Sequence, residues 1–202
     1  MCAAARSRRD TKHANRVRIV GGAWRSRLVK FPDRANLRPT PDRVRETLFN
    51  WLGQDLTGAV VLDLFAGSGV LGIEAASRRA QHVVLVERDP VSCRALEENC
   101  RALAAHQVEV VRADALEFLT RDRTRYDVVF LDPPFASDYW HRLLEALPDH
   151  LAPDGVVYCE SGSLLHLHAG WEPYKKGRAG QVNFLLLKRT PHDSKSGLSG
   201  DV

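Results

Sequence analysis

The chain has 202 residues, of which 44% are hydrophobic and 27% charged, as expected for one soluble globular domain with extensions. No apolar run is long enough to cross a membrane and no hydrophobic leader follows Met1, so the sequence excludes an integral membrane protein and predicts a cytoplasmic one. The net charge of +4 is uneven, because residues 1–45 contain 13 Lys and Arg against 3 Asp and Glu, which indicates a polyanionic partner or a solvated tail.

The first predicted elements are a basic arm and a hairpin. Residues 1–15 are rich in Ala, Arg and Ser and lack apolar periodicity, so we expect a flexible arm. Residues 17–20 and 24–31 are strand-like and are separated by Gly21 and Gly22, a pattern that predicts a β-hairpin. Three arginines fall on this hairpin: Arg18, Arg25 and Arg27. They would line a projecting ribbon that contacts RNA, unless the hairpin packs against the body of the domain.

A helix is predicted next, up to about Gly53, which serves as its stop. Thr40 is the expected N-cap and Pro41 the expected first helical residue. An apolar stripe along the helix is formed by Val44, Leu48, Trp51 and Leu52. Arg43 and Arg45 are expected to lie off this stripe.

From residue 60 onward, strand-like and helix-like segments alternate, which predicts a parallel sheet with crossover helices. The predicted strands are residues 60–64, 83–87, 108–112, 126–131, 155–160 and 182–188. The predicted helices are residues 69–79, 90–104, 114–121, 138–150 and a weak one at 162–168. The last two apolar runs, 171–175 and 182–188, predict an antiparallel pair that closes the sheet, and residues 190–202 a frayed tail.

The four cysteines are Cys2, Cys93, Cys100 and Cys159, and no two have CxxC spacing. The sequence therefore predicts neither a zinc site nor a disulfide framework, and free thiols are typical of a reducing cytosol. Cys93 and Cys100 recur at helical spacing with leucines, so we expect them on the buried face of the helix 90–104.

A glycine-rich turn follows the first strand of the predicted sheet. Gly67, Gly69 and Gly72 form a GxGxxG pattern, and Glu87 stands 20 residues after Gly67. Glycines let a ligand approach the backbone, the helix N-terminus offers N–H groups, and the acid suits ribose hydroxyls. This pattern matches the dinucleotide fingerprint, so a dehydrogenase is one interpretation.

Further acids favour a different ligand. Asp63 precedes the glycines at the strand end, where it would repel a pyrophosphate but attract an ammonium group. Asp114, followed by Ala115, closes the third strand and suits an adenine amino group. With Glu87 and Asp132, acids stand at four successive strand ends. A ligand with an α-amino group, a ribose and an adenine matches the first three, which predicts S-adenosylmethionine rather than NAD.

The fourth strand of the predicted sheet runs into Asp132, Pro133, Pro134 and Phe135. Two prolines fix φ near about −65° and donate no N–H, so the backbone leaves the strand extended with free carbonyls. The Asp132 carboxylate and the Pro133 carbonyl can accept from an exocyclic amino group, while Phe135 offers a ring for base stacking. This set suits a reaction centre that orients an amino nitrogen towards an electrophile, although it also suits a plain strand-ending turn.

These motifs resemble those of known enzymes. Residues 63–69 (DLFAGSG) and 132–135 (DPPF) resemble class I S-adenosylmethionine-dependent amino-methyltransferases. Residues 38–52 (RPTPDRVRETLFNWL), with residues 18–24 (RIVGGAW) before them, resemble the RsmD family, which methylates guanine N2 in bacterial 16S ribosomal RNA. The resemblance covers residues 16–189. It implies an α/β, Rossmann-like class I methyltransferase fold: a mostly parallel seven-stranded sheet with an antiparallel last strand, plus an N-terminal β-hairpin extension.

The resemblance also implies which residues act. S-adenosylmethionine would be bound by Asp63, Phe65, Ala66, Gly67, Gly69, Glu87, Asp114 and Ala115. The target guanine would be held by Asp132, Pro133, Pro134 and Phe135. The 16S ribosomal RNA would be contacted by Arg18, Arg25, Arg27, Arg38 and Arg43. No metal is implied.

We therefore expect a basic arm (1–15), an RNA-binding extension (16–53), a methyltransferase domain (54–189) and a flexible tail (190–202). We also expect a monomer that acts on the assembled small ribosomal subunit. Adenine N6-methyltransferases share the two central motifs, so N6 transfer to DNA or RNA is an alternative. A non-catalytic RNA-binding protein with the same fold is another.

Overall fold

The computed structural model describes residues 15–33, 39–133, 137–161, 167, 170–180 and 182–190. The strands are β1 (Asn15–Arg18), β2 (Leu28–Phe31), β3 (Val60–Asp63), β4 (His82–Glu87), β5 (Val108–Arg112), β6 (Tyr126–Leu131), β7 (Leu151–Ser161), β8 (Trp171–Ala179) and β9 (Val182–Arg189). The helices are α1 (Asp42–Leu52), α2 (Val70–Ser77), α3 (Pro90–Leu103), α4 (Ala115–Arg121) and α5 (Ser137–Ala146). None of these helices has the length and apolar character needed to span a membrane.

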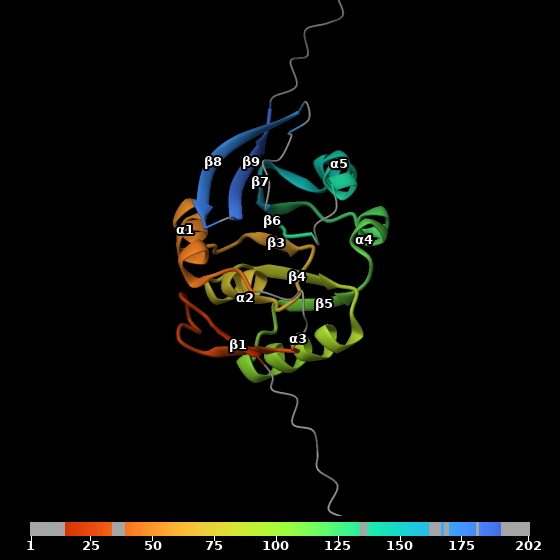
Figure 1. The fold of residues 1–202 in the computed structure, drawn as a ribbon. Coiled ribbons are helices and arrows are strands. Elements are labelled where there is room, and N and C mark those ends of the chain that lie inside the picture. The colour runs from red at the N-terminus through yellow and green to blue at the C-terminus, as the bar shows by residue number, and fades with distance from the viewer. Residues whose placement is uncertain are drawn as a thin grey trace, which may run out of the picture.

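Seven strands form one sheet in the order β5-β4-β3-β6-β7-β9-β8 (Figure 1). Strands β3 to β7 pair in parallel, whereas β9 runs antiparallel to both β7 and β8. The predicted mostly parallel sheet with an antiparallel closing pair is thus confirmed. Strands β4 and β5 follow β3 on one side of it, and β6 then pairs with the other side of β3. In open α/β sheets, ligands bind beyond the carboxyl ends of the strands at such a switch point.

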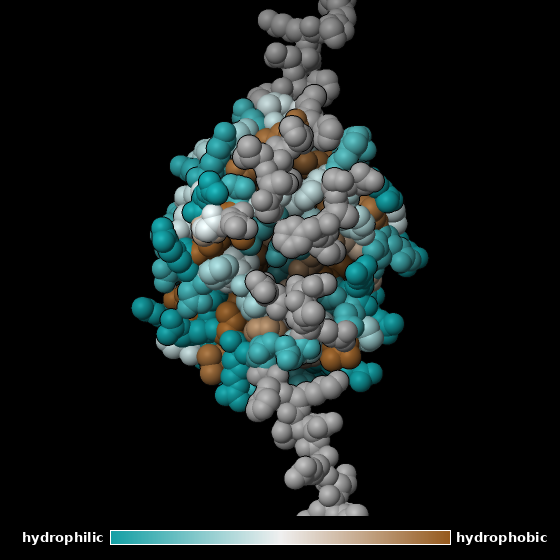
Figure 2. Space-filling view, viewed as in Figure 1, coloured by the Kyte–Doolittle hydropathy of each residue, from teal (hydrophilic) through white to brown (hydrophobic). Residues whose placement is uncertain are grey.

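Helices cover both faces of the sheet. One hydrophobic cluster joins a face of the sheet to α1, α2, α3 and the hairpin, and a second joins the other face to α4 and α5. Figure 1 shows α4 and α5 on the side opposite α1. The last four residues of β6, 128–131, are all apolar because the strand is buried on both faces of the sheet. Hydrophilic residues cover most of the described surface on the face in Figure 2.

The hairpin is shorter than predicted and packs on the body. Strand β2 begins at Leu28 rather than Trp24, because the residues before it form turns. Asn99 of α3 accepts from the Lys30 backbone N–H (3.0 Å) and donates to the Lys30 carbonyl (2.7 Å). Val29 is fully buried in the core. The structure therefore shows the packed hairpin and not a projecting ribbon.

Three predictions for α1 are wrong. Thr40 is not the N-cap and Pro41 is not the first helical residue, since Pro41 occupies the N-cap position, the helix begins at Asp42 and no side chain caps it. The Thr40 hydroxyl instead donates to Glu160 Oε1 at 2.6 Å. Arg45 does not lie off the buried side of the helix but is fully buried. Gly53 ends the helix as predicted, with a positive φ of 93°.

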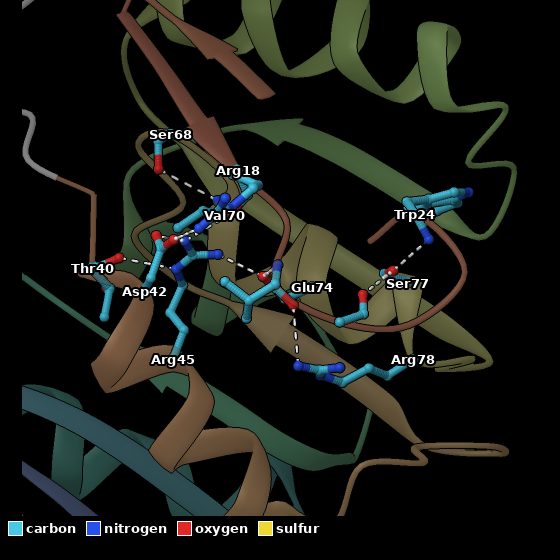
Figure 3. Close-up of polar contacts among 12 residues, drawn as sticks. Arg18, Trp24, Thr40, Asp42, Arg45, Ser68, Val70, Glu74, Ser77 and Arg78 are labelled. Carbon is cyan, nitrogen blue, oxygen red and sulfur yellow. Dashed lines mark hydrogen bonds and ion pairs between the residues drawn. The ribbon is translucent and has the colours of Figure 1, made fainter. Parts of the chain in front are cut away.

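Arg45 is buried because charged and polar partners surround it (Figure 3). Its guanidinium lies 2.5 Å from Glu74 Oε1 and 2.5 Å from Asp42 Oδ1, and it also donates to two backbone carbonyls. Glu74 pairs with Arg78 at 3.4 Å and accepts from the Val20 backbone N–H. Burial raises the pKa of Glu74, while Arg45 and Arg78 oppose this shift. This buried charge network joins the hairpin and α1 to α2.

The predicted helix 138–150 divides into α5 and a 3₁₀ turn at Leu147–His150. Pro148 has no N–H to donate to the Leu144 carbonyl, and that carbonyl accepts from Trp171 Nε1 at 3.0 Å instead. The weak helix predicted at 162–168 falls outside the described residues apart from Leu167.

Candidate active site

The structure brings the four predicted acids to one edge of the sheet. Asp63 and Glu87 are the last residues of β3 and β4, and Asp114 and Asp132 follow β5 and β6 by two residues and one residue. Because these strands are adjacent and parallel, their carboxyl ends lie side by side. The acids flank the switch point between β3 and β6, which is the position that the sequence predicts for a ligand site.

Asp63 is buried, with only 3% of its surface exposed. Its Oδ2 accepts from the backbone N–H of Gly72 at 3.1 Å, which ties β3 to helix α2. Burial raises the pKa of Asp63 to about 7, and the nearby Glu87 carboxylate adds to this shift. A carboxylate that is short of solvent gains most from a cationic ligand, so Asp63 suits an ammonium group.

Glu87 shapes the glycine-rich turn. One of its oxygens accepts from the Gly67 backbone N–H (2.9 Å) and the other from the Asp89 backbone N–H (2.8 Å). Gly67 and Gly69 have φ values of 51° and 75°, which favour glycine. Each oxygen of Glu87 keeps acceptor capacity, as binding two adjacent hydroxyls requires.

Asp114 has a structural role that sequence patterns did not reveal. Its Oδ1 accepts from the Leu116 backbone N–H at 3.0 Å, so Asp114 is the N-cap of α4. Its Oδ2 accepts from the Tyr139 hydroxyl at 3.0 Å. The Tyr139 ring packs edge-on against Phe65, with the ring centroids 5.9 Å apart. Ala115, the first residue of α4, is buried beside this group.

Two of the four residues predicted to hold the target base lie in the described part of the chain. Asp132 is exposed and Pro133 is buried, whereas Pro134 and Phe135 lie outside the described residues. Asp132 keeps contact with solvent, but the protein around its carboxylate raises its pKa to about 7, and the neighbouring Glu160 and Asp63 add to this shift.

Glu160 is a fifth acid at this edge, and the sequence patterns above do not single it out. It lies on β7, which pairs with β6 so that Leu131 is in register with Cys159. Glu160 is 8% exposed, and burial raises its pKa. Its Oε1 accepts from the hydroxyls of Thr40 (2.6 Å) and Tyr158 (2.9 Å). Glu160 ends the predicted strand 155–160, so the strand-end rule that selects the other acids also applies to it.

The five arginines predicted to contact RNA fall into different settings. Arg18 pairs with Asp42 at 3.0 Å, and Arg27 donates to the Ala102 carbonyl at 2.6 Å. The side chains of Arg25 and Arg43 are exposed and have no hydrogen bond or ion pair with the rest of the described chain. Arg38 lies outside the described residues.

A hollow of about 530 Å³ lies away from the row of acids. It is lined by the Gly21–Gly22 turn, by the C-terminal half of α1 and by Arg78 at the end of α2. Of the predicted site residues, the hollow includes Arg25 but none of the strand-end acids. It is therefore not the predicted cofactor site.

Comparison with known proteins identifies the family. The model of a family described as "Conserved hypothetical protein 95" matches residues 17–188. "Ribosomal RNA small subunit methyltransferase D" of Escherichia coli (strain K12) is 41% identical over 181 residues, covering 87% of this chain and 91% of that protein. The protein of the same name from Haemophilus influenzae is 38% identical, covering 85% and 93%. The chain belongs to the RsmD family of methyltransferases.

Solved structures support the RsmD-family assignment. A "putative methyltransferase yhhF from Escherichia coli" has a TM-score of 0.79 at 39% identity, covering 87% of this chain and 98% of that one. The "16S rRNA N2 G1207 methyltransferase (RsmC)" of Thermus thermophilus, in complex with AdoMet and guanosine, has a TM-score of 0.67 at 24% identity, covering 88% and 50%, and shares the fold. The chain thus has a class I methyltransferase fold, which favours the methyltransferase interpretation of the glycine pattern over the dehydrogenase one.

Proposed function

We propose that the protein transfers a methyl group from S-adenosylmethionine to the exocyclic N2 of a guanine in 16S ribosomal RNA. We further propose that it acts as a monomer, in the cytoplasm, on the assembled small subunit. The observation that carries the proposal is the juxtaposition of Asp63 and Asp132 at the ends of adjacent strands. One carboxylate suits the ammonium group of the methyl donor, and the other suits the amino group that receives the methyl.

The acceptor groups at the strand ends fit S-adenosylmethionine, which supplies an electrophilic methyl group on a sulfonium centre. Asp63 would accept from the ammonium group, and Glu87 would accept from the ribose hydroxyls with the acceptor capacity that its two backbone contacts leave. Asp114 and Ala115 would border the adenine. Phe65, Ala66 and the glycines of the turn would surround the methionine part.

At the other half of the site, Asp132 and the Pro133 carbonyl would accept the two N2 hydrogens of a splayed guanine. Both hydrogen bonds would direct the nitrogen lone pair towards the methyl group. The nitrogen becomes acidic only after it has gained the methyl, so a strong general base is not needed. Holding the reacting atoms in line would therefore account for most of the rate. Pro134 and Phe135 would complete this pocket.

Cofactor affinity is expected to depend on the ionisation of Asp63. Its pKa is raised to about 7, so the carboxylate is largely protonated at pH 6 and becomes ionised as the pH rises. Titration calorimetry should show tighter binding of S-adenosylmethionine at pH 7.5 than at pH 6, because only the ionised form attracts the ammonium group. Asp63→Asn should bind weakly at both pH values. Equal affinity of the wild type at both pH values would remove Asp63 from the ammonium site.

RNA affinity is expected to depend on Arg25 and Arg43, whose side chains are exposed and free of partners in the described chain. The double substitution Arg25→Ala/Arg43→Ala should weaken RNA binding and reduce the slope of log affinity against log salt by about one for each phosphate that is no longer neutralised. The double substitution Arg121→Ala/Arg123→Ala removes the same number of charges at the end of α4, which packs on the other face of the sheet from the hairpin, and serves as the control. A salt slope that does not change in the Arg25→Ala/Arg43→Ala variant would remove Arg25 and Arg43 from the RNA interface.

The substrate form is tested by methyl transfer from labelled S-adenosylmethionine to small-subunit particles from a strain that lacks the activity. Their deproteinised RNA is the parallel substrate. We expect the particles to be labelled faster than the naked RNA. Faster labelling of naked RNA would instead place the reaction before assembly of the subunit.

A further inference from the structure

Glu160 stands beside the residue proposed to hold the target amino group. Because Leu131 of β6 is in register with Cys159 of β7, Asp132 and Glu160 occupy the next position on adjacent parallel strands. Neighbouring strands lie about 4.8 Å apart. The carboxylates are close enough for Glu160 to contribute to the raised pKa of Asp132.

Glu160 faces α1, on the same side of the sheet as Asp63. Tyr158, two residues earlier on β7, packs in the hydrophobic cluster that contains α1 and α2, and it donates to Glu160 from that side. Thr40, just before α1, donates to the same oxygen, Oε1. Phe130 of β6 pairs with Tyr158 of β7 on one side and with Asp63 of β3 on the other, so these three residues are level across the sheet. Asp63 and Glu160 therefore belong to one face, with the end of β6 between them.

The two hydrogen bonds that Glu160 accepts fix its side chain and leave one oxygen available. Both donors bind Oε1, and no residue in the described part of the chain donates to Oε2. Oε2 therefore keeps acceptor capacity that a ligand with a donor could use. The donor is expected beside Asp132, at the edge where the target base would enter.

We propose that Glu160 accepts a hydrogen bond from the N1–H of the target guanine and thereby makes the site select guanine over adenine. This inference rests on the proposed function. Guanine presents two adjacent donors on one edge, the N2 amino group and N1–H, which match two adjacent carboxylates. Adenine presents an acceptor at N1, whose lone pair would face the Glu160 carboxylate. A site that accepts a hydrogen bond from its substrate discriminates strongly against an analogue without that donor. The reason is that the acceptor of the site, covered by the bound analogue, is left unpaired.

The test uses 2-aminopurine, which keeps the amino group of guanine but has an acceptor at N1. The guanine that the wild type methylates is mapped first and then replaced by 2-aminopurine in reconstituted particles. The preference, defined as kcat/KM for guanine over kcat/KM for 2-aminopurine, is measured for the wild type and Glu160→Gln. The effects of the missing O6 are the same for both proteins and cancel in the comparison.

We expect Glu160→Gln to lower the preference for guanine by about 10- to 100-fold, as the loss of one charge-assisted hydrogen bond implies. The glutamine amide can donate to N1 of 2-aminopurine, which adds to the change. Each preference is measured on a single preparation, so the fraction of folded protein does not affect it. Glu172→Gln, an exposed residue on β8, is the matched control and should keep the wild-type preference.

A second variant, Thr40→Val, removes one of the two donors that fix Glu160 and should lower the preference by a smaller factor. If the wild type labels guanine and Glu160→Gln keeps the wild-type preference for guanine over 2-aminopurine, the inference about Glu160 is wrong and the proposed function stands. A wild type that labels adenine would overturn the proposed function and the inference together.

Discussion

Replacing Asp132 with alanine is expected to lower the rate of methyl transfer by about 100-fold or more, because a misplaced target amino group no longer meets the methyl in line. The affinity for S-adenosylmethionine should stay close to that of the wild type, since the proposed cofactor contacts come from β3, β4 and the start of α4. The effect should therefore appear in kcat under saturating cofactor, measured on small-subunit particles.

Asp154→Ala is the matched control for this substitution. Asp154 is an exposed aspartate on β7, and it should keep normal turnover. Near-normal turnover of Asp132→Ala with cofactor binding intact would show that Asp132 does not hold the target base. Loss of cofactor binding in Asp132→Ala would instead assign this residue to the cofactor half of the site.

The largest expected effect on stability comes from Glu74. Its carboxylate is fully buried between Arg45 and Arg78, whose side chains are 0% and 3% exposed. Glu74→Ala would leave two buried cations with reduced compensation, which is expected to lower the free energy of unfolding by about 3–5 kcal/mol. Urea unfolding should show a lower midpoint with an unchanged slope.

Asp55→Ala provides the comparison, because Asp55 pairs with Arg79 at the surface, where both side chains are more than half exposed. Surface pairs contribute about 0–1 kcal/mol, so this variant should unfold at nearly the wild-type midpoint. If Glu74→Ala were no less stable than Asp55→Ala, the buried network would not hold the hairpin and α1 to α2.

The parallel sheet and the row of acids could be predicted from sequence because both leave local signals. A strand buried on both faces, such as β6, reads as an unbroken apolar run, and a strand end followed by a glycine or proline turn marks the edge where ligands bind. Strand ends, together with the match of their carboxylates to the groups of S-adenosylmethionine and of an amino substrate, select Asp63, Glu87, Asp114 and Asp132, and the structure puts all four at adjacent strand ends.

The settings of Arg45 and Thr40 could not be predicted, because their partners are distant in the chain. Arg45 is buried against Glu74, 29 residues away, and Thr40 donates to Glu160, 120 residues away. Capping rules and helical periodicity consider only neighbouring residues, so they assign Thr40 to the helix start and Arg45 to a position off the apolar stripe. Tertiary partners decide both positions.

The most direct test of the proposed function is nucleoside analysis of small-subunit RNA after reaction with the wild-type protein and labelled S-adenosylmethionine. We predict that the label is recovered in N2-methylguanosine. Label in N6-methyladenosine would contradict the proposed substrate, although it would keep the fold and the methyl donor.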